Sequence, residues 1–84
     1  MKPIRLSGHA RQQLPYRGAT EQEIEEAIRS AEWTSAELGR LECQMDFPFR
    51  ETWQGKVYTT KQVRPIFVEE NEEIVVVTVY TYYF

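Results

Sequence analysis

The single histidine of this 84-residue chain, His9, lies in a segment whose charged side chains are all basic. Residues 1–18 carry four cationic side chains and no carboxylate, although the whole chain has a formal net charge of −3. Histidine titrates near neutral pH, so beside arginines it could transfer protons at an anionic site. Together with Arg17, Arg64 and Tyr80, it suits the metal-free cleavage of a phosphodiester.

Each side chain of this set has a role in the nuclease hypothesis. His9 would act as the base or the acid, and Arg17, Lys61 and Arg64 would stabilise the charge that builds on the phosphorus oxygens. Tyr80 would donate a proton or stack on a base of the RNA. Candidates for substrate binding are Arg11, Lys61 and Thr78.

Structural roles compete with these assignments. A histidine on a helix is more often a hydrogen-bonding structural residue. Arg17 could simply bond to the carbonyls that end a helix, and Tyr80 and Tyr82 could be core or interface aromatics. Cys43 lies on the apolar parity of its strand, which favours a core thiol over a nucleophile. One histidine and one cysteine do not form a standard zinc site, so we expect no metal and no cofactor.

The composition indicates one domain, residues 1–84, in the cytoplasm. Hydrophobic residues make up 42% of the chain, which is enough for a core, and one cysteine excludes an internal disulfide. The sequence has neither the apolar run of a signal peptide nor one that could cross a membrane, so we expect no membrane partner. The acidic net charge argues against bulk nucleic-acid binding, but the basic blocks 1–18 and 47–68 could converge on one face.

Two helices should position the amino-terminal candidates. Ser7 is a plausible N-cap of the first helix, Pro15 should end or kink it, and Gly18 tolerates a positive φ. Thr20 and Glu23 have the spacing of a capping box that opens a second helix. The apolar residues of that helix form one buried stripe at Ile24, Ala27, Ile28 and Ala31.

The remainder of the chain is strand-like. Residues 41–47 alternate between apolar and polar, and Pro48 should interrupt this strand. Gln54 and Gly55 predict a hairpin turn into a strand over residues 56–69, which Pro65 should bulge or break. Residues 74–84 form the strongest strand signal, with apolar odd positions from 75 to 79. Helices before strands predict an α+β fold, with two helices on one face of a curved, four-stranded antiparallel sheet.

Several of these residues share their spacing with a known family. His9-Ala10, Arg17-Gly18 and Thr78 with Tyr80 resemble the pattern H-A-x-x-R-x-x-x-R-G followed by V-x-T-V-Y. The family with this pattern is a widespread bacterial domain of unknown function, grouped with the RelE, ParE and BrnT toxins of toxin–antitoxin systems. The resemblance implies a RelE-like fold, a metal-free endoribonuclease, RNA as substrate and an antitoxin as partner. The chain departs from the pattern at Gln13, where a neutral amide replaces an arginine that could hold a phosphate.

A second hypothesis is a non-catalytic interaction module. The last six residues include four aromatic side chains, and tyrosine-rich surfaces favour interfaces. Tyr82, Tyr83 and Phe84 are the interface candidates, and this strand could pair edge to edge with a partner protein or with a second copy in a homodimer. Convergence of His9, Arg17 and Arg64 in one cleft would favour the enzyme.

Overall fold

The computed structural model describes all 84 residues and is an α+β structure with two helices and a mixed six-stranded sheet. Its elements, in chain order, are β1 (Ile4–Leu6), α1 (Gly8–Arg17), α2 (Glu21–Ser30), β2 (Thr34–Ser35), a 3₁₀ turn η1 (Glu37–Gly39), β3 (Leu41–Glu42), β4 (Met45–Trp53), β5 (Lys56–Glu69) and β6 (Ile74–Tyr83). The sheet order is β1-β6-β5-β3-β2, and β4 also pairs with β5. Neither helix is long and apolar enough to span a bilayer.

The helix ends follow from local chemistry. The Ser7 hydroxyl accepts a hydrogen bond from the Ala10 amide, and Thr20 forms the predicted capping box. Of the two outcomes expected at Pro15, an end or a kink, the end is not found, because the helix continues to Arg17 and closes at Gly18, whose φ is 74°. Pro15 is exposed, so the hydrogen bond that its missing amide would make is lost on the solvent side, where water can replace it.

The sheet differs from the four antiparallel strands that the sequence predicts. β1 runs parallel to β6, with Ile4 opposite Ile74, and the Arg5–Glu73 ion pair links the start of the chain to the β5–β6 hairpin. β2 and β3 are two residues each and flank η1. Segments this short show no periodicity, which explains why sequence patterning misses them.

The strand expected over residues 41–47 divides into β3 and β4 at Cys43 and Gln44. Its pairing with β5 passes through Pro48 and becomes irregular only between Pro48 and Glu51. The predicted turn at Gln54 and Gly55 joins β4 to β5, with positive φ at both residues. This hairpin is therefore confirmed. β4 is not interrupted at Pro48, but it pairs with β5 alone and so lies at an edge of the sheet, where a proline in a strand is tolerated.

The bulge or break expected near Pro65 is found in part: β5 continues through the proline, but its pairing with β3 and β4 is interrupted at residues 64 and 65. The Pro65 carbonyl accepts a long hydrogen bond of 3.4 Å from the Cys43 amide, so its nitrogen also faces the gap between β3 and β4. Because the ladder is interrupted there, the missing amide hydrogen of the proline removes no regular sheet bond. The register shift with β6 falls instead between Ile66 and Phe67.

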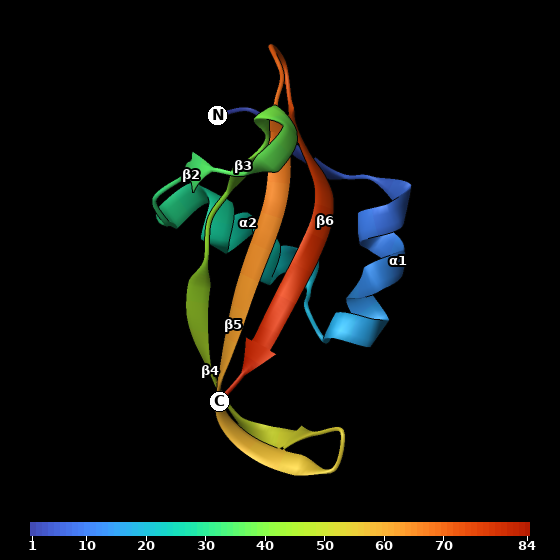
Figure 1. Ribbon diagram of the computed structural model, residues 1–84, viewed down its shortest axis with the longest axis vertical. Coiled ribbons are helices and arrows are strands. Elements are labelled where there is room, and N and C mark those ends of the chain that lie inside the picture. The colour runs from blue at the N-terminus through green and yellow to red at the C-terminus, as the bar shows by residue number, and fades with distance from the viewer.

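One face of the sheet is covered by α2, which lies behind the strands in Figure 1. Ile24, Ala27 and Ile28 of α2 pack with the buried Val63 and Phe67 of β5 in one core. The bulge in β6 changes the parity of burial, so Val76 and Val79 are both buried and the expected odd series from residue 75 is not kept.

α1 does not lie on this face as predicted but along the outer edge of β6 (Figure 1). The Gln13 Oε1 atom accepts hydrogen bonds from the Val79 amide at 3.0 Å and from the Thr78 hydroxyl at 2.8 Å. Gln13 thus takes the place of a neighbouring strand beyond the short β1. Neither α1 nor α2 covers the opposite face of the sheet, and only the turn η1 lies in front of it, at one end (Figure 1). We call this face the open face.

Candidate functional site

The open face presents its side chains in rows that the strand register fixes. Side chains alternate between the two faces of a strand, so directly opposite residues on neighbouring strands share a face. From β3 or β4 through β5 to β6, the rows are Glu42–Ile66–Thr78, then Arg64–Tyr80, then Asp46–Gln62–Tyr82. The three rows place predicted site residues beside polar residues that belong to other segments.

Tyr80 lies between two arginines on this face. The Arg17 Cζ atom is 5.5 Å from the centroid of the Tyr80 ring, and Arg64 is the cross-strand neighbour of Tyr80. The Arg64 Cζ atom is also 5.1 Å from the centroid of the Tyr82 ring. A guanidinium group over an aromatic face is attracted by the ring quadrupole. We call these four residues the arginine–tyrosine cluster.

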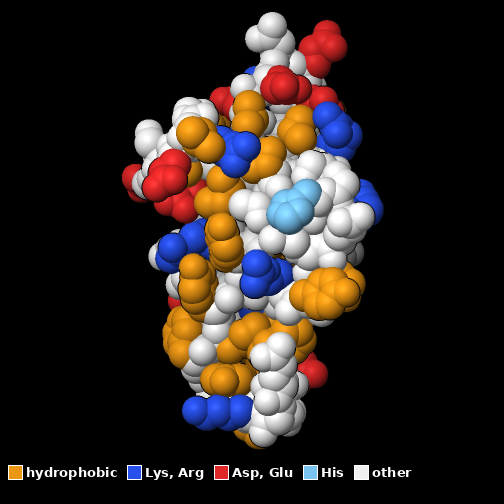
Figure 2. Space-filling view, turned by 45° about the vertical axis from the view of Figure 1, so that its right-hand side comes forward, with side chains coloured by type: hydrophobic (Ala, Val, Ile, Leu, Met, Phe, Trp, Pro, Cys, Tyr) orange, Lys and Arg blue, Asp and Glu red, His pale blue; other side chains and the backbone are white.

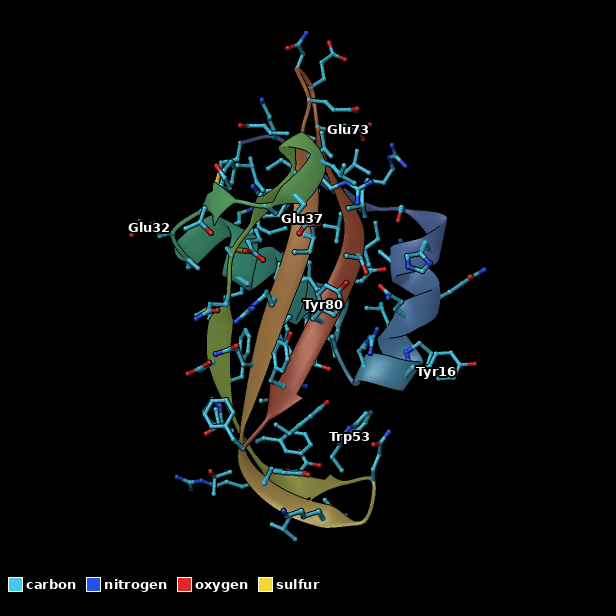
Figure 3. All side chains as sticks on the ribbon, in the orientation of Figure 1. Tyr16, Glu32, Glu37, Trp53, Glu73 and Tyr80 are labelled. Carbon is cyan, nitrogen blue, oxygen red and sulfur yellow. The ribbon has the colours of Figure 1, made fainter.

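The cluster remains accessible to a ligand. Tyr80 is 41% exposed and Tyr82 46%, and the Tyr80 side chain projects in front of the sheet in Figure 3. Figure 2 shows basic and hydrophobic side chains next to one another along this side of the molecule. Exposed rings beside fixed positive charges can receive both flat and anionic groups.

The charges of both arginines are uncompensated. The Arg64 Nη2 atom donates hydrogen bonds to the amide oxygens of Gln44 at 2.6 Å and Gln62 at 3.3 Å, and neither Arg17 nor Arg64 forms an ion pair with a carboxylate. The Nε atoms of both arginines are buried without a hydrogen-bond partner. Two guanidinium groups in this state favour an anion between them.

Arg17 is positioned by the attachment of the α1 C-terminus to the sheet. Thr81 and Tyr83 donate their hydroxyl hydrogens to the Arg17 carbonyl at 2.7 and 2.6 Å, and Lys61 donates to the Gly18 carbonyl at 2.9 Å. Burial raises the pKa of Tyr83, so its hydroxyl keeps the proton that it donates. These bonds hold the Arg17 side chain beside Tyr80.

A hollow of about 610 Å³ opens next to the cluster, between η1 and the sheet. Its walls include Glu37, Arg40 and Glu42 on one side and Ile66, Thr78 and Tyr80 on the other. Figure 3 shows Glu37 and Tyr80 on the same side of the sheet, one above the other. Because Tyr80 belongs to both, the hollow and the cluster form one continuous site.

His9 lies apart from the cluster. It is exposed near the start of α1 and makes no hydrogen bond or ion pair, and Figure 2 shows its imidazole, in pale blue, at the surface. Eight residues separate it from Arg17, which is about 12 Å along a helix axis. The structure therefore brings Arg17 and Arg64 together without the histidine that the nuclease hypothesis places with them.

The other predicted binding residues have protein partners. Arg11 is exposed on α1 and pairs with Glu21. Lys61 is only 7% exposed and lies on the covered face, where its Nζ atom is 2.8 Å from Glu23. Neither side chain contributes to the open face, whereas Thr78 lies at its edge.

The three interface candidates point in different directions. Tyr82 belongs to the open face, whereas the Tyr83 ring stacks on Trp53 with centroids 4.9 Å apart. Phe84 is 57% exposed, and its backbone pairs with Thr60. An exposed aromatic surface is thus provided by Tyr82 and Phe84 but not by Tyr83.

Sequence reasoning missed the residues that complete the site. Glu37 and Arg40 flank a turn with no periodic signal, so nothing in their spacing indicates that they face Tyr80. Glu42 and Gln44 carry a signal, because they occupy the polar parity of the segment 41–47. If the polar positions of this segment had been placed on the same sheet face as Arg64, both Glu42 and Gln44 would have been identified.

A comparison of the chain with protein-family models, with curated proteins and with solved structures finds no match. The resemblance to the RelE-like family therefore stays a prediction from the sequence.

Proposed function

We propose that this protein is a cytoplasmic, RelE-like protein that binds single-stranded RNA on the open face. The observation that carries the proposal is the position of the Tyr80 ring between Arg17 and Arg64, with Tyr82 exposed beside it. Single-stranded RNA offers phosphates to guanidinium groups and unstacked bases to aromatic rings. No folded segment of the chain covers these groups.

The spacing along β6 supports this binding mode. Tyr80 and Tyr82 are two residues apart, so their Cα atoms are separated by about 6.8 Å along the strand. Each ring can therefore take a separate base, while Arg17 and Arg64 flank the first ring on either side. The phosphates of the RNA would follow β6, away from the carboxylates of Glu42 on β3 and Asp46 on β4.

Cleavage is the further step that the family resemblance implies. In this step the ribose 2′-OH would attack the phosphorus and lose its proton to a base, and the leaving oxygen would take a proton from Tyr80. Arg17 and Arg64 would stabilise the negative charge on the phosphorus oxygens. His9 lies two helical turns from this cluster, so no imidazole base is assembled with it. RNA binding is thus the function that the geometry supports best, and metal-free cleavage is tested together with it.

The test is fluorescence anisotropy of a short labelled single-stranded RNA in the presence of EDTA. We expect Arg64→Ala to weaken binding about tenfold and to reduce the salt dependence of log K from a slope of about −1.4 to about −0.7, as for the loss of one of two phosphate contacts. Arg11→Ala is the control, because Arg11 is an arginine on α1 that lies outside the open face.

Two results would contradict the proposal. The first is an absence of RNA binding at low salt, and the second is an equal effect of the Arg64 and Arg11 substitutions. Gel analysis of the same mixtures measures cleavage. Intact RNA after prolonged incubation, with no effect of His9→Ala on growth during expression, would exclude the nuclease but not RNA binding.

A protein-interaction module is the second candidate, because Val57, Tyr82 and Phe84 are 69%, 46% and 57% exposed near the C-terminal end of the sheet. If this surface joins two copies, deletion of residues 82–84 should increase the elution volume on a sizing column at unchanged circular dichroism. An unchanged elution volume would exclude the homodimer. The antitoxin that the resemblance implies would be a small protein encoded beside this one and co-purifying with it.

A further inference from the structure

We propose that the hollow between η1 and the sheet selects a guanine base, with the Glu42 carboxylate accepting hydrogen bonds from the N1–H and N2–H₂ groups of the base. This inference rests on the proposed RNA binding, because Arg17 and Arg64 would hold the adjoining phosphates. It adds sequence selectivity, which phosphate contacts alone do not give.

The register of the sheet fixes the spacing of the residues on the floor of the hollow. Glu42, Ile66 and Thr78 lie opposite one another on β3, β5 and β6. Neighbouring strands are about 4.8 Å apart, so Glu42 and Thr78 are separated by about 10 Å with Ile66 between them. A base lying on Ile66 would have one edge toward Glu42 and the other toward Thr78.

The charged groups of the hollow have no partners within the protein. The side chains of Glu37, Arg40 and Glu42 form no hydrogen bond and no ion pair, although Arg40 and Glu42 are half-buried. Half-buried charges without partners are unfavourable, and a ligand with complementary donors and acceptors would remove this cost. The two carboxylates repel phosphate, so the base rather than the backbone enters here.

Guanine is the base whose edges match these groups. A carboxylate accepts two parallel N–H bonds, and guanine alone among the RNA bases has two adjacent N–H donors on its Watson–Crick edge. Adenine and cytosine place an acceptor beside their amino group, and uracil has one N–H between two carbonyls. Arginine is the residue type that donates to guanine O6 and N7, and Arg40 lines the same hollow.

Leu38 at the rim provides a second, independent feature. Its φ of 60° is in the left-handed region, which is unfavourable for a residue with a side chain, and the side chain is 85% exposed. In the free protein this apolar side chain is held in solvent. When a base enters the hollow, the side chain would pack against it and cover it. Leu38 and Ile66 both line the hollow.

The experiment compares uridine oligonucleotides that differ at one position, which is guanosine, inosine, adenosine or uridine. Inosine lacks the N2 amino group and isolates one of the two proposed hydrogen bonds. We expect guanosine to bind about tenfold more tightly than adenosine, with inosine between them. Glu42→Gln should remove this preference, whereas the exposed control Glu51→Gln should keep it.

Three other outcomes of this experiment would each contradict a different part of the proposal. Equal affinities for all four oligonucleotides would contradict the guanine site while leaving RNA binding intact. A preference for guanosine that survives Glu42→Gln, in a protein with an unchanged urea midpoint, would contradict the role of Glu42. No binding to any of the oligonucleotides would contradict the proposed function itself.

Discussion

Lys61 and Arg64 show how strand parity decides the role of a cation on β5. Lys61 points to the covered face, where it binds Glu23 and the Gly18 carbonyl. Arg64 points to the open face, where amide oxygens hold it and its charge stays uncompensated. We therefore infer that Lys61 stabilises the fold and that Arg64 binds the ligand.

The buried position of Lys61 predicts that its substitution destabilises the fold much more than substitution of an exposed lysine on the same strand. We expect Lys61→Ala to lower the free energy of unfolding by about 2–3 kcal/mol, because it leaves the mostly buried Glu23 without its partner. Lys56→Ala, at an exposed lysine, should change it by less than about 0.5 kcal/mol. Urea denaturation measures both. A Lys61→Ala protein of normal stability that binds RNA weakly would instead place Lys61 in the binding site.

For single residues, the sequence predicts which face of the sheet a side chain occupies but not which residues from other elements lie beside it. The period of two indicates that Tyr80 and Tyr82 share a face, and that Cys43 is a core residue. Cys43 is 3% exposed, and burial raises the pKa of its thiol to about 11, so it is protonated at neutral pH. The distance of His9 from Arg64 depends on where α1 lies, which no local pattern determines.

The element that decides the site is α1 in its position against β6. β1 pairs with only three residues of β6, and beyond them the side chain of Gln13 and the carbonyl of Arg17 bind the strand. The departure from the family pattern at Gln13 thus has a structural consequence, because an arginine has no acceptor for the Val79 amide. The neutral amide fixes the helix at the sheet edge.

The two glycines of the α1 region provide a matched test of this attachment. Gly18 has a φ of 74°, and a Cβ atom there would lie 2.3 Å from the Tyr83 Oη atom, whereas a Cβ atom at Gly8 would meet nothing within 4 Å. We expect Gly18→Ala to destabilise the fold by about 2 kcal/mol or more and to weaken RNA binding. Gly8→Ala, in the first turn of α1, should be neutral or stabilising by up to about 1 kcal/mol.

Thermal unfolding and the anisotropy assay measure these effects. Similar stability of the two alanine variants would contradict the close contact of Gly18 with Tyr83. Normal RNA binding by a destabilised but folded Gly18→Ala protein would contradict the role of the α1 C-terminus in positioning Arg17.

Among the elements, the long ones could be predicted and the short ones could not. β5 has the predicted bounds, and α2 has the predicted capping box and buried stripe, because each contains several periods of its pattern. β1, β2 and β3 contain two or three residues each, and tertiary pairing alone defines them. The bulge in β6 likewise follows from its pairing with β5.

At the scale of the whole molecule, one face of the sheet packs against α2 and the other carries the proposed binding site. The molecule measures 41 × 24 × 23 Å, and β5 and β6 run along its long axis, so the open face can follow an extended strand (Figure 1). The expected convergence of the two basic blocks is found in part. Arg17 and Arg64 share the open face, whereas Lys2 and Arg5 pair with Glu69 and Glu73 at the opposite end.

The most direct measurement of the central claim is amide chemical-shift mapping of the labelled protein during titration with a short single-stranded RNA containing one guanosine. The account predicts that the shifted signals concentrate on the open face, at Arg17, at residues 62–66 and 78–82, and at residues 37–42 around the hollow. Shifts confined to α2 and the β5–β6 hairpin, or no shifts at a large excess of RNA, would contradict it.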